Sequence, residues 1–299
     1  MANVKGSENA DLLVGSNGND VITALGGNDV ISGSFGRDDI DGGNGSDTID
    51  YSNFDTSIAV TLRGDHRAPA SFDGVDRDML VNIENIRGGG GDDYFVGDHS
   101  DNTFWGNGGD DYFVASNGFD TYFGGDGYDM VDYGSIQGPL VIKPTGGAFT
   151  VVSVNGGAYD RLASIENILG GAFADTIVGT GADNYFRGNS GGDTLSGGAG
   201  GDRLVGGKGN DRLTGGADAD IFVFRAGDGV DVITDFDASG GNHDVLDLRG
   251  VGVIDSFKDL MSMHVSLQGD NVLIYRGPGD AITLVDVDIK QLDSSDFLF

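Results

Sequence analysis

The sequence predicts an all-β solenoid built from nine-residue repeats. Nonapeptides follow one another without gaps in three blocks, residues 6–50, 88–132 and 170–223. Nearly every repeat has an aspartate at its sixth position and an apolar residue at its eighth. The blocks begin at Gly6, Gly88 and Gly170, each 82 residues after the one before. Internal duplication of this regularity favours one solenoid over three unrelated domains.

Each nonapeptide predicts a loop followed by a very short strand. In the third block, residues 188–214 read GNSGGDTLS, GGAGGDRLV and GGKGNDRLT. Glycine permits positive φ and tight turning, so the first six residues favour a loop. The last three place one apolar side chain inward, as a short strand does. A carboxylate that recurs once per loop among exposed carbonyls is the type of oxygen site that Ca²⁺ prefers.

The sixth positions supply the candidate calcium ligands. They are Asp11, Asp20, Asp29, Asp38, Asp47, Asp93, Asp111, Asp120, Asp129, Asp175, Asp193, Asp202, Asp211, Asp220 and, in a degenerate repeat at 226–234, Asp231. Two repeats have asparagine there instead, Asn102 and Asn184. Asp101 and Asp183 precede them, so either the carboxylate is displaced by one place or these two coils lack a full calcium site.

The eighth positions predict a core one side chain wide per face. In the first block they are aliphatic, and in the second they are mostly aromatic, as in Phe95, Phe104, Phe113 and Tyr122. So thin a core is too small to offset the conformational entropy of 55 glycines. Ion binding must therefore supply much of the folding free energy.

Two connecting segments interrupt the repeats, residues 51–87 and 133–169. Both begin with tyrosine after aspartate and end in an IENI motif at the same 82-residue offset. Residues 57–62 alternate and are β-branched, which predicts a strand, and the IENI motif is expected to restart the coil. The predicted organisation is therefore repeat units at 6–87, 88–169 and 170–223, followed by a distinct region at 224–299.

The region 224–299 predicts a small β-rich cap. A short helix is expected over 255–263, and alternating strands over 265–267, 271–275 and 281–285. A solenoid needs a polar cap to cover its last apolar coil.

Composition excludes several classes of function. Acidic residues outnumber basic ones 48 to 17, and the formal charge is −31. This charge argues against nucleic acid as a partner and against electrostatic attachment to anionic membranes. No cysteine is present, so disulfides and thiolate metal sites are excluded. No Sec-type signal or membrane-spanning stretch is visible in the sequence.

The repeats resemble those of the RTX, or haemolysin-type, calcium-binding proteins. The resemblance implies a right-handed parallel β-roll with two nonapeptides per coil and a calcium ion between loops i and i+2. It implies about ten ions if every such pair binds one. It also implies a secreted, extracellular protein that leaves through a type I secretion machinery. Residues 224–299 are similar to the C-terminal domain of serralysin-type proteases and alginate epimerase modules, which implies a secretion signal near the end.

Three classes of function follow from these observations. We expect a non-enzymatic calcium-binding protein with a structural, adhesive or interaction role at an extracellular polysaccharide or cell surface. The repeats begin at residue 6, no HExxH motif is present, and the four histidines are expected to be solvated. The first alternative is an enzyme acting on acidic polysaccharide, for which Tyr185, Arg187, Arg203 and Arg212 are the available side chains. The second is a membrane-active RTX protein.

Overall fold

The computed structural model describes the backbone of residues 1–299 and every side chain except that of Asp76. The chain forms two compact units. The first contains Met1–Ile136, Ala148–Val151 and Ala158–Ile165, and the second contains Gln137–Gly147, Val152–Gly157 and Glu166–Phe299. The boundary between the units falls in the second connecting segment. The division by the 82-residue period stays a prediction.

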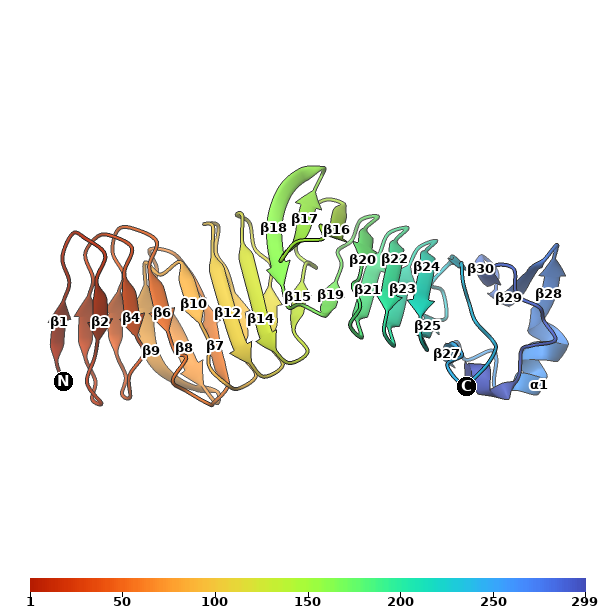
Figure 1. Ribbon diagram of the computed structural model, residues 1–299, viewed down its shortest axis with the longest axis horizontal. Helices are drawn as coiled ribbons and strands as arrows, with labels where there is room; N and C mark the ends of the chain where they lie inside the picture. The colour runs from red at the N-terminus through yellow and green to blue at the C-terminus, as the bar shows by residue number, and fades with distance from the viewer. The chain divides into compact units, whose positions relative to one another are not determined.

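The first unit consists of short strands that alternate between two sheets (Figure 1). Its strands are β1 (Asn3–Lys5), β2 (Leu12–Val14), β3 (Val21–Thr23), β4 (Val30–Ser32), β5 (Asp39–Asp41), β6 (Thr48–Asp50), β7 (Ile58–Thr61), β8 (Ala68–Phe72), β9 (Val75–Val81), β10 (Asn85–Arg87), β11 (Tyr94–Val96), β12 (Thr103–Gly108), β13 (Tyr112–Val114), β14 (Thr121–Asp126) and β15 (Met130–Asp132). One sheet has the order β1-β3-β5-β9-β8-β7-β11-β13-β15, and the other contains β2-β4-β6-β10-β12-β14.

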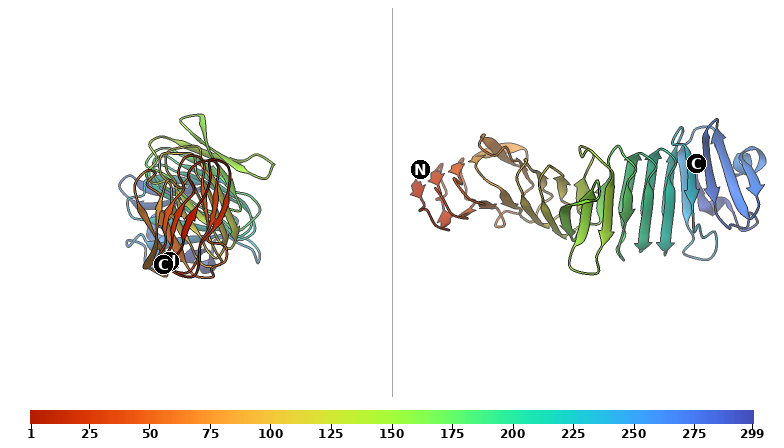
Figure 2. Two further views of the ribbon diagram at one scale, coloured as in Figure 1. Left: turned by 90° about the vertical axis from the view of Figure 1, so that its left-hand side faces the viewer. Right: turned by 90° about the horizontal axis from the view of Figure 1, so that it is seen from above.

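The register shows that two nonapeptides make one coil. Leu12 pairs with Val30, and Val21 pairs with Asp39, in parallel ladders between residues 18 apart. Successive repeats therefore fall on opposite sheets, and their loops on opposite sides. Figure 2 shows these coils from the N-terminal end and from above. The predicted parallel β-roll is confirmed.

The first connecting segment adds an antiparallel excursion to one sheet. The strand predicted over 57–62 is present as β7, which pairs antiparallel with β8, and β8 pairs antiparallel with β9. The IENI motif then restarts the coil as predicted, because β10 pairs in parallel with both β6 and β12. In the second connecting segment lie β16 (Leu140–Pro144), β17 (Thr150–Val154) and β18 (Gly157–Ala163).

The second unit repeats the arrangement. Its further strands are β19 (Asn167–Leu169), β20 (Thr176–Val178), β21 (Tyr185–Ser190), β22 (Thr194–Ala199), β23 (Arg203–Lys208), β24 (Arg212–Ala217), β25 (Ile221–Arg225), β26 (Val230–Ile233), β27 (Val245–Gly250), β28 (Val265–Gln268), β29 (Asn271–Gly277), β30 (Asp280–Leu284) and β31 (Phe297–Leu298). One sheet has the order β19-β21-β23-β25-β27-β31, and the other β20-β22-β24-β26-β30-β29-β28.

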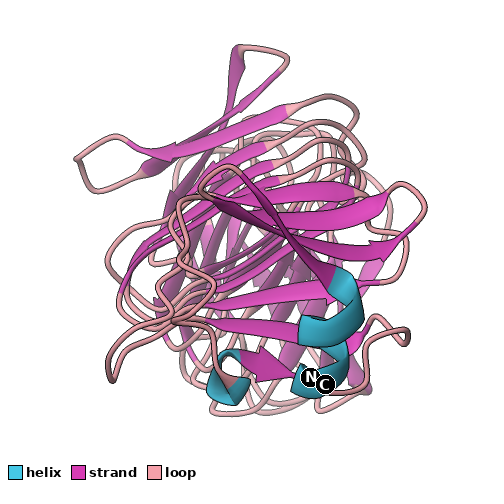
Figure 3. Cartoon of the chain, turned by 90° about the vertical axis from the view of Figure 1, so that its right-hand side faces the viewer, coloured by secondary structure: helices cyan, strands magenta, loops and turns pink.

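The C-terminal end closes the second unit with antiparallel strands. The β28–β29 and β29–β30 pairs are antiparallel, whereas β30 pairs in parallel with β26 of the last repeat. The predicted helix at 255–263 is present as α1 (Phe257–Asp259) followed by a π-helical turn, η1 (Leu260–His264), and a 3-10 turn, η2 (Ser294–Asp296), lies near the end. Figure 3 views this end, with the helical segments in cyan.

The core lies where the eighth positions predict it. Those side chains are buried in every repeat of the three blocks, from Leu13 to Phe222. In the second block Phe104 stacks on Tyr122 with ring centroids 5.5 Å apart. The column of apolar side chains packs between the two sheets, and the aspartates lie in the loops on both sides of it.

Candidate calcium sites

The sixth-position aspartates form regular ladders along the loops. One carboxylate oxygen, Oδ1, accepts the backbone N–H of the sixth residue two repeats earlier. Asp47 accepts from Asp29 at 2.8 Å, and Asp211 accepts from Asp193 at 2.8 Å. These aspartates are buried, because each loop covers the carboxylate of its neighbour. The ladder fixes one oxygen of each carboxylate and leaves the other to the loop interior.

The second oxygen divides the repeats into two kinds. In one kind Oδ2 has no hydrogen-bond donor among the described residues, although the side chain is at most 2% exposed. Members with this unpartnered oxygen are Asp29, Asp47, Asp111, Asp193, Asp202, Asp211 and Asp220. Burying a carboxylate oxygen without a partner costs several kcal/mol unless a cation or donor compensates. These loops therefore have an unmet requirement for positive charge.

In the other kind the loop itself satisfies the carboxylate. The N–H of the second residue donates to Oδ2 in several loops, for example from Gly89 to Asp93 at 2.9 Å and from Gly171 to Asp175 at 2.8 Å. A serine hydroxyl at the second position does the same for Asp120, where Ser116 donates at 2.8 Å. In such a loop both oxygens of the carboxylate already have a hydrogen-bond donor, so burial leaves less unmet need for a cation.

The backbone at the second position separates the two kinds of loop. We call a loop open when this residue is in the left-handed region and closed when it is not. The second residues of the open loops are Leu25, Gly43, Asn107, Gly125, Asn189, Gly198, Gly207 and Gly216, with φ between 72° and 124°. In the second and third blocks this residue pairs instead with its counterpart in the next coil, as Asn189 does with Gly207 and Gly198 does with Gly216. Its N–H is then turned away from the aspartate.

The first glycine of an open loop shows how tightly oxygen atoms gather there. A Cβ added at Gly106 would overlap Oδ2 of Asp111 and would come within 2.7 Å of the Gly124 carbonyl oxygen. At Gly188 it would overlap Oδ2 of Asp193 and come within 2.7 Å of the Gly206 carbonyl. Carboxylate and carbonyl oxygens in a cradle without side-chain bulk fit the oxygen ligands that Ca²⁺ takes. Within the described residues no cluster of three or more His, Cys, Asp or Glu side chains suited to a metal is found.

Burial also raises the pKa of these carboxyls. Loss of solvation raises the pKa of Asp111 to about 8, against the lowering effect of the Asp93 N–H. The same cause raises the pKa of Asp193 to about 7, that of Asp211 to about 7 and that of Asp220 to about 7. Without a metal ion the charged form is therefore disfavoured, and a bound cation would restore it.

The two asparagine repeats have closed loops. Nδ2 of Asn102 donates to the Glu84 carbonyl at 2.9 Å, and Nδ2 of Asn184 donates to the Glu166 carbonyl at 2.8 Å. Oδ1 of Asp101 accepts the Phe119 N–H and Oδ1 of Asp183 accepts the Gly201 N–H, both at 2.8 Å and both on the exposed side of the loop. Both interpretations of these repeats, a carboxylate displaced by one place or a coil without a full calcium site, stay predictions.

Four ladder members were absent from the candidates drawn from the sequence. Asp78 accepts the Asp38 N–H at 2.9 Å, Asp160 that of Asp120 at 2.8 Å, and Glu84 that of Asp47 at 2.8 Å. Asp244 accepts the Asp220 N–H at 3.0 Å. Asp78 and Asp160 are 82 residues apart, which is a signal that the sequence contains. They lie outside the nonapeptide repeats, however, and 40 residues from the Asp38 and Asp120 N–H groups that they accept.

The two terminal candidates differ from the rest. Asp11 accepts the N–H and the hydroxyl of Ser7, at 2.6 and 2.9 Å, so its loop is closed. Asp231 joins the ladder through the Asp211 N–H at 3.0 Å, but its Oδ2 lies 2.7 Å from the guanidinium of Arg276.

Of the four side chains named for the enzyme alternative, three lie on neighbouring strands of one sheet. Tyr185 and Arg187 are on β21, and Arg203 on β23 pairs with Tyr185, whereas Arg212 lies on β24 in the other sheet. His66 lies against Asp65, and both are exposed. His243 is 3.8 Å from Asp296. No helix in the described part of the chain is long and apolar enough to cross a membrane.

Fold and site together define a calcium-binding β-roll. The family model of the RTX calcium-binding nonapeptide repeat matches residues 5–40, 14–49, 83–113, 100–131, 163–195 and 196–231. These segments cover more than half of the 299 residues. The chain belongs to the RTX calcium-binding nonapeptide repeat family.

Two solved structures are similar to parts of the chain. One is the crystal structure of the extracellular lipase LipA from Serratia marcescens, with a TM-score of 0.37 and 21% identity over 73% of this chain. The chain spans 41% of that lipase. The other is the solution structure of the AlgE6R3 subunit of the Azotobacter vinelandii mannuronan C5-epimerase, with a TM-score of 0.35 and 28% identity over 42% of this chain and 78% of that one. The comparison with curated proteins gave no match.

Proposed function

We propose that this β-roll folds on extracellular calcium and serves a structural, adhesive or interaction role rather than a catalytic one. The observation that carries the proposal is made at seven buried sixth-position aspartates, whose Oδ2 has no donor among the described residues. The arrangement costs the chain stability, and a bound cation compensates this cost. Extracellular calcium sites of this kind are typically tuned to roughly millimolar concentrations.

Calcium binds, in this proposal, at the eight open loops and not at the closed ones. Eight divalent ions would neutralise about half of the formal charge of −31 and relieve its repulsion. The sequence-based number of about ten treats every pair of same-side loops as equal. The structure supports a different count, because a closed loop has already satisfied its carboxylate.

Secretion through a type I machinery belongs to the same proposal. Coils with unpartnered carboxylates are unstable where calcium is scarce, so much of the chain can remain unfolded until it leaves the cell. The resemblance of residues 224–299 to C-terminal secretion domains, expected from the sequence, belongs to this proposal. An extracellular polysaccharide or a cell surface is the partner that we propose for the folded roll.

The test is a count of bound calcium by isothermal titration in matched variants. Asp211→Asn removes an unpartnered carboxylate from an open loop, and we expect about one ion fewer per chain. Asp120→Asn makes the same change in a closed loop, at a position where two other repeats already have asparagine, and the count should stay unchanged. Equal losses in both variants would refute the assignment of calcium to open loops.

A second measurement tests the coupling to folding. Far-UV circular dichroism should show only part of the β signal in EGTA and gain the rest in millimolar calcium, because the open loops depend on the ion. A complete β spectrum in EGTA would sink the proposal, and a screen of uronate polymers as substrates would then come next.

A further inference from the structure

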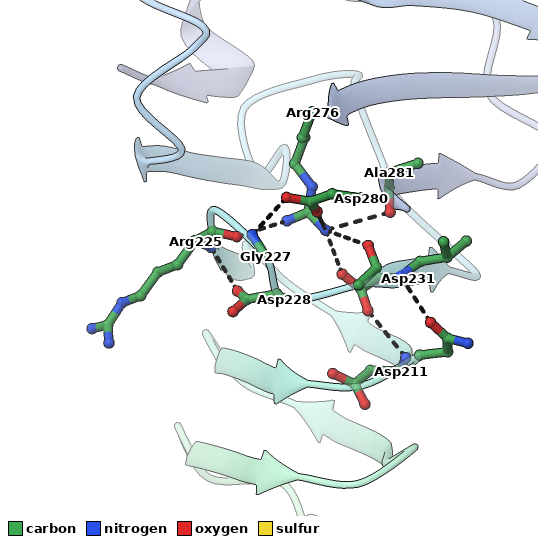
Figure 4. A network of polar contacts seen from close by, with 11 residues as sticks. Asp211, Arg225, Gly227, Asp228, Asp231, Arg276, Asp280 and Ala281 are labelled. Atoms are coloured by element: carbon green, nitrogen blue, oxygen red, sulfur yellow. Dashed lines mark hydrogen bonds and ion pairs between the residues drawn. The ribbon is translucent and has the colours of Figure 1, made fainter. Parts of the chain in front are cut away.

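Arg276 is a fully buried cation in a strongly acidic protein. It lies on β29, in the antiparallel part of the C-terminal region, and its side chain is 0% exposed. The guanidinium points toward the last repeat loop, residues 226–231 (Figure 4). Burying a charge is costly unless it is paired, so its partners must compensate fully.

The partners surround a single nitrogen. One terminal nitrogen of Arg276 lies 2.7 Å from Oδ2 of Asp231 and 2.7 Å from Oδ1 of Asp280. The same nitrogen lies 2.9 Å from the Gly229 carbonyl and 3.4 Å from the Ala281 carbonyl. An NH₂ group has two hydrogens, so four oxygens exceed what it can donate to. Two carboxylates and two carbonyls around one positive centre are instead the ligand types of a calcium site.

This centre lies at the end of one row of the repeat loops. Asp193, Asp211 and Asp231 form the row: Asp211 accepts the backbone N–H of Asp193, and Asp231 accepts that of Asp211. In Asp193 and Asp211, Oδ2 has no donor among the described residues. In Asp231 the same oxygen contacts Arg276. The guanidinium also lies over the Phe224 ring, 4.9 Å from its centroid, which adds a cation–π contact.

The other row ends without a cation. There Asp202 and Asp220 are followed by Asp244, whose Oδ2 accepts the backbone N–H of Asp237 at 2.9 Å. The last carboxylate of that row is therefore satisfied by a backbone N–H, as in the closed loops. In the row of Asp231, the last carboxylate is instead paired with a positive charge, which the chain supplies as Arg276.

We propose that Arg276 is a built-in cation that takes the place of calcium at the end of this row. The proposal rests on the proposed function, because it assumes that the preceding open loops bind calcium. It assigns Asp231 as a ligand of the arginine and not of a metal ion. It also makes the junction of β26 with β29 and β30 independent of calcium, whereas the loops before it depend on calcium.

Hydrogen exchange on the full chain tests this, in EGTA and in millimolar calcium. The variants are Arg276→Met, which removes the charge, Arg276→Lys, which keeps it, and Arg212→Met as a control on an exposed arginine of β24. In wild type and control we expect residues 226–233 and 271–284 to stay protected in EGTA. In Arg276→Met they should exchange about 100-fold faster in EGTA, because Asp231 and Asp280 lose their partner.

Calcium should then rescue the variant. Without the guanidinium, the oxygens of Asp231, Gly229 and Asp280 can hold an ion, so Arg276→Met should recover protection in calcium and bind one ion more than the control. Arg276→Lys should retain most of the protection in EGTA. The proposal is overturned if Arg276→Met exchanges like the control in EGTA, if calcium does not restore it, or if the lysine variant behaves like the methionine variant.

The same data separate this proposal from the proposed function. If residues 188–217 show no response to calcium in any variant, the open loops are not calcium sites and the proposed function fails. An effect of Arg276→Met in EGTA is measured on different residues, so the two results are read independently.

Discussion

The third block of repeats and the first two blocks use the same nonapeptide but meet the charge of their aspartates differently. In the blocks at 6–50 and 88–132, open loops occur only at the third and fifth repeats, which lie on the same side of the roll. The other side has closed loops, in which Ser34 and Ser116 donate to Asp38 and Asp120. In the block at 170–223, the last four repeats are all open, and both sides carry unpartnered carboxylates.

The difference teaches that the ladder and the core do not require calcium at every loop. Backbone N–H donors hold Oδ1 in open and closed loops alike, at nearly the same distances. Whether a loop is open or closed depends on its second residue. In an open loop this residue has a left-handed backbone, which turns its N–H away from the aspartate. A roll can thus combine coils that support themselves with coils that depend on an ion.

Removing calcium should have the largest effect, and the third block should respond most. Its four consecutive open loops leave four buried carboxylates without compensation, so residues 185–217 should lose protection from hydrogen exchange in EGTA. Residues 21–50, where open loops alternate with closed ones, should lose less. Uniform loss along the chain would show that the two kinds of loop are energetically equivalent.

A side chain at an open-loop glycine should have the next largest effect. Gly207 has a φ of 103°, and an added Cβ would overlap the Asn189 carbonyl oxygen. Gly207→Ala should lower the free energy of unfolding in calcium by at least about 2 kcal/mol, measured by urea denaturation. Gly241→Ala is the control, because a Cβ added there would meet no atom within 4 Å and its φ is outside the left-handed region. Equal effects at both positions would contradict the role of the left-handed second residue.

Acidification should partly replace calcium in the second and third blocks, where burial raises the pKa of the loop carboxyls most. The folded-state pKa of Asp193 is about 7 and that of Asp202 about 6, both above the usual value of 3.8. The folded state then binds more protons than the unfolded state between about pH 4 and 7, so stability in EGTA rises as the pH falls through this window and is lost as the pH rises. Urea midpoints at pH 5 and pH 8 measure this. In saturating calcium the sign should reverse, since protons compete with the ion for the carboxylates.

The smallest effect should come from opening a closed loop. Ser34→Gly removes the hydroxyl that donates to Oδ2 of Asp38 at 2.7 Å, which should cost about 1 kcal/mol of stability in EGTA. The freed oxygen then resembles that of an open loop, so part of this loss should be recovered in calcium. Ser52→Gly, at an exposed turn, is the control. A loss that calcium leaves unchanged would mean that the backbone at the second position, and not the donor, decides whether the loop binds an ion.

The repeats could be predicted closely because they depend on local chemistry. Each repeat of nine residues contains one aspartate in its loop and one inward apolar residue in its strand, and these determine the loop, the strand and the core. Ile31 and Phe113 are buried where this pattern predicts. The connecting segments were harder, since Asp78 and Asp160 reach the ladder across 40 residues. Sequence spacing alone does not show that an excursion returns a carboxylate to the same row.

The sequence by itself therefore determined the coil, its apolar column and the carboxylates that line its loops, because each of these repeats within nine residues. Only the tertiary structure decided which carboxylates keep an unpartnered oxygen, since that depends on the backbone at Leu25 or Gly207 and on the coil stacked against it. It also brought Arg276 to Asp231 across 45 residues. No local sequence pattern predicts such an ion pair. It forms because β29 and β30 fold back onto the last repeat and place Arg276 against its loop.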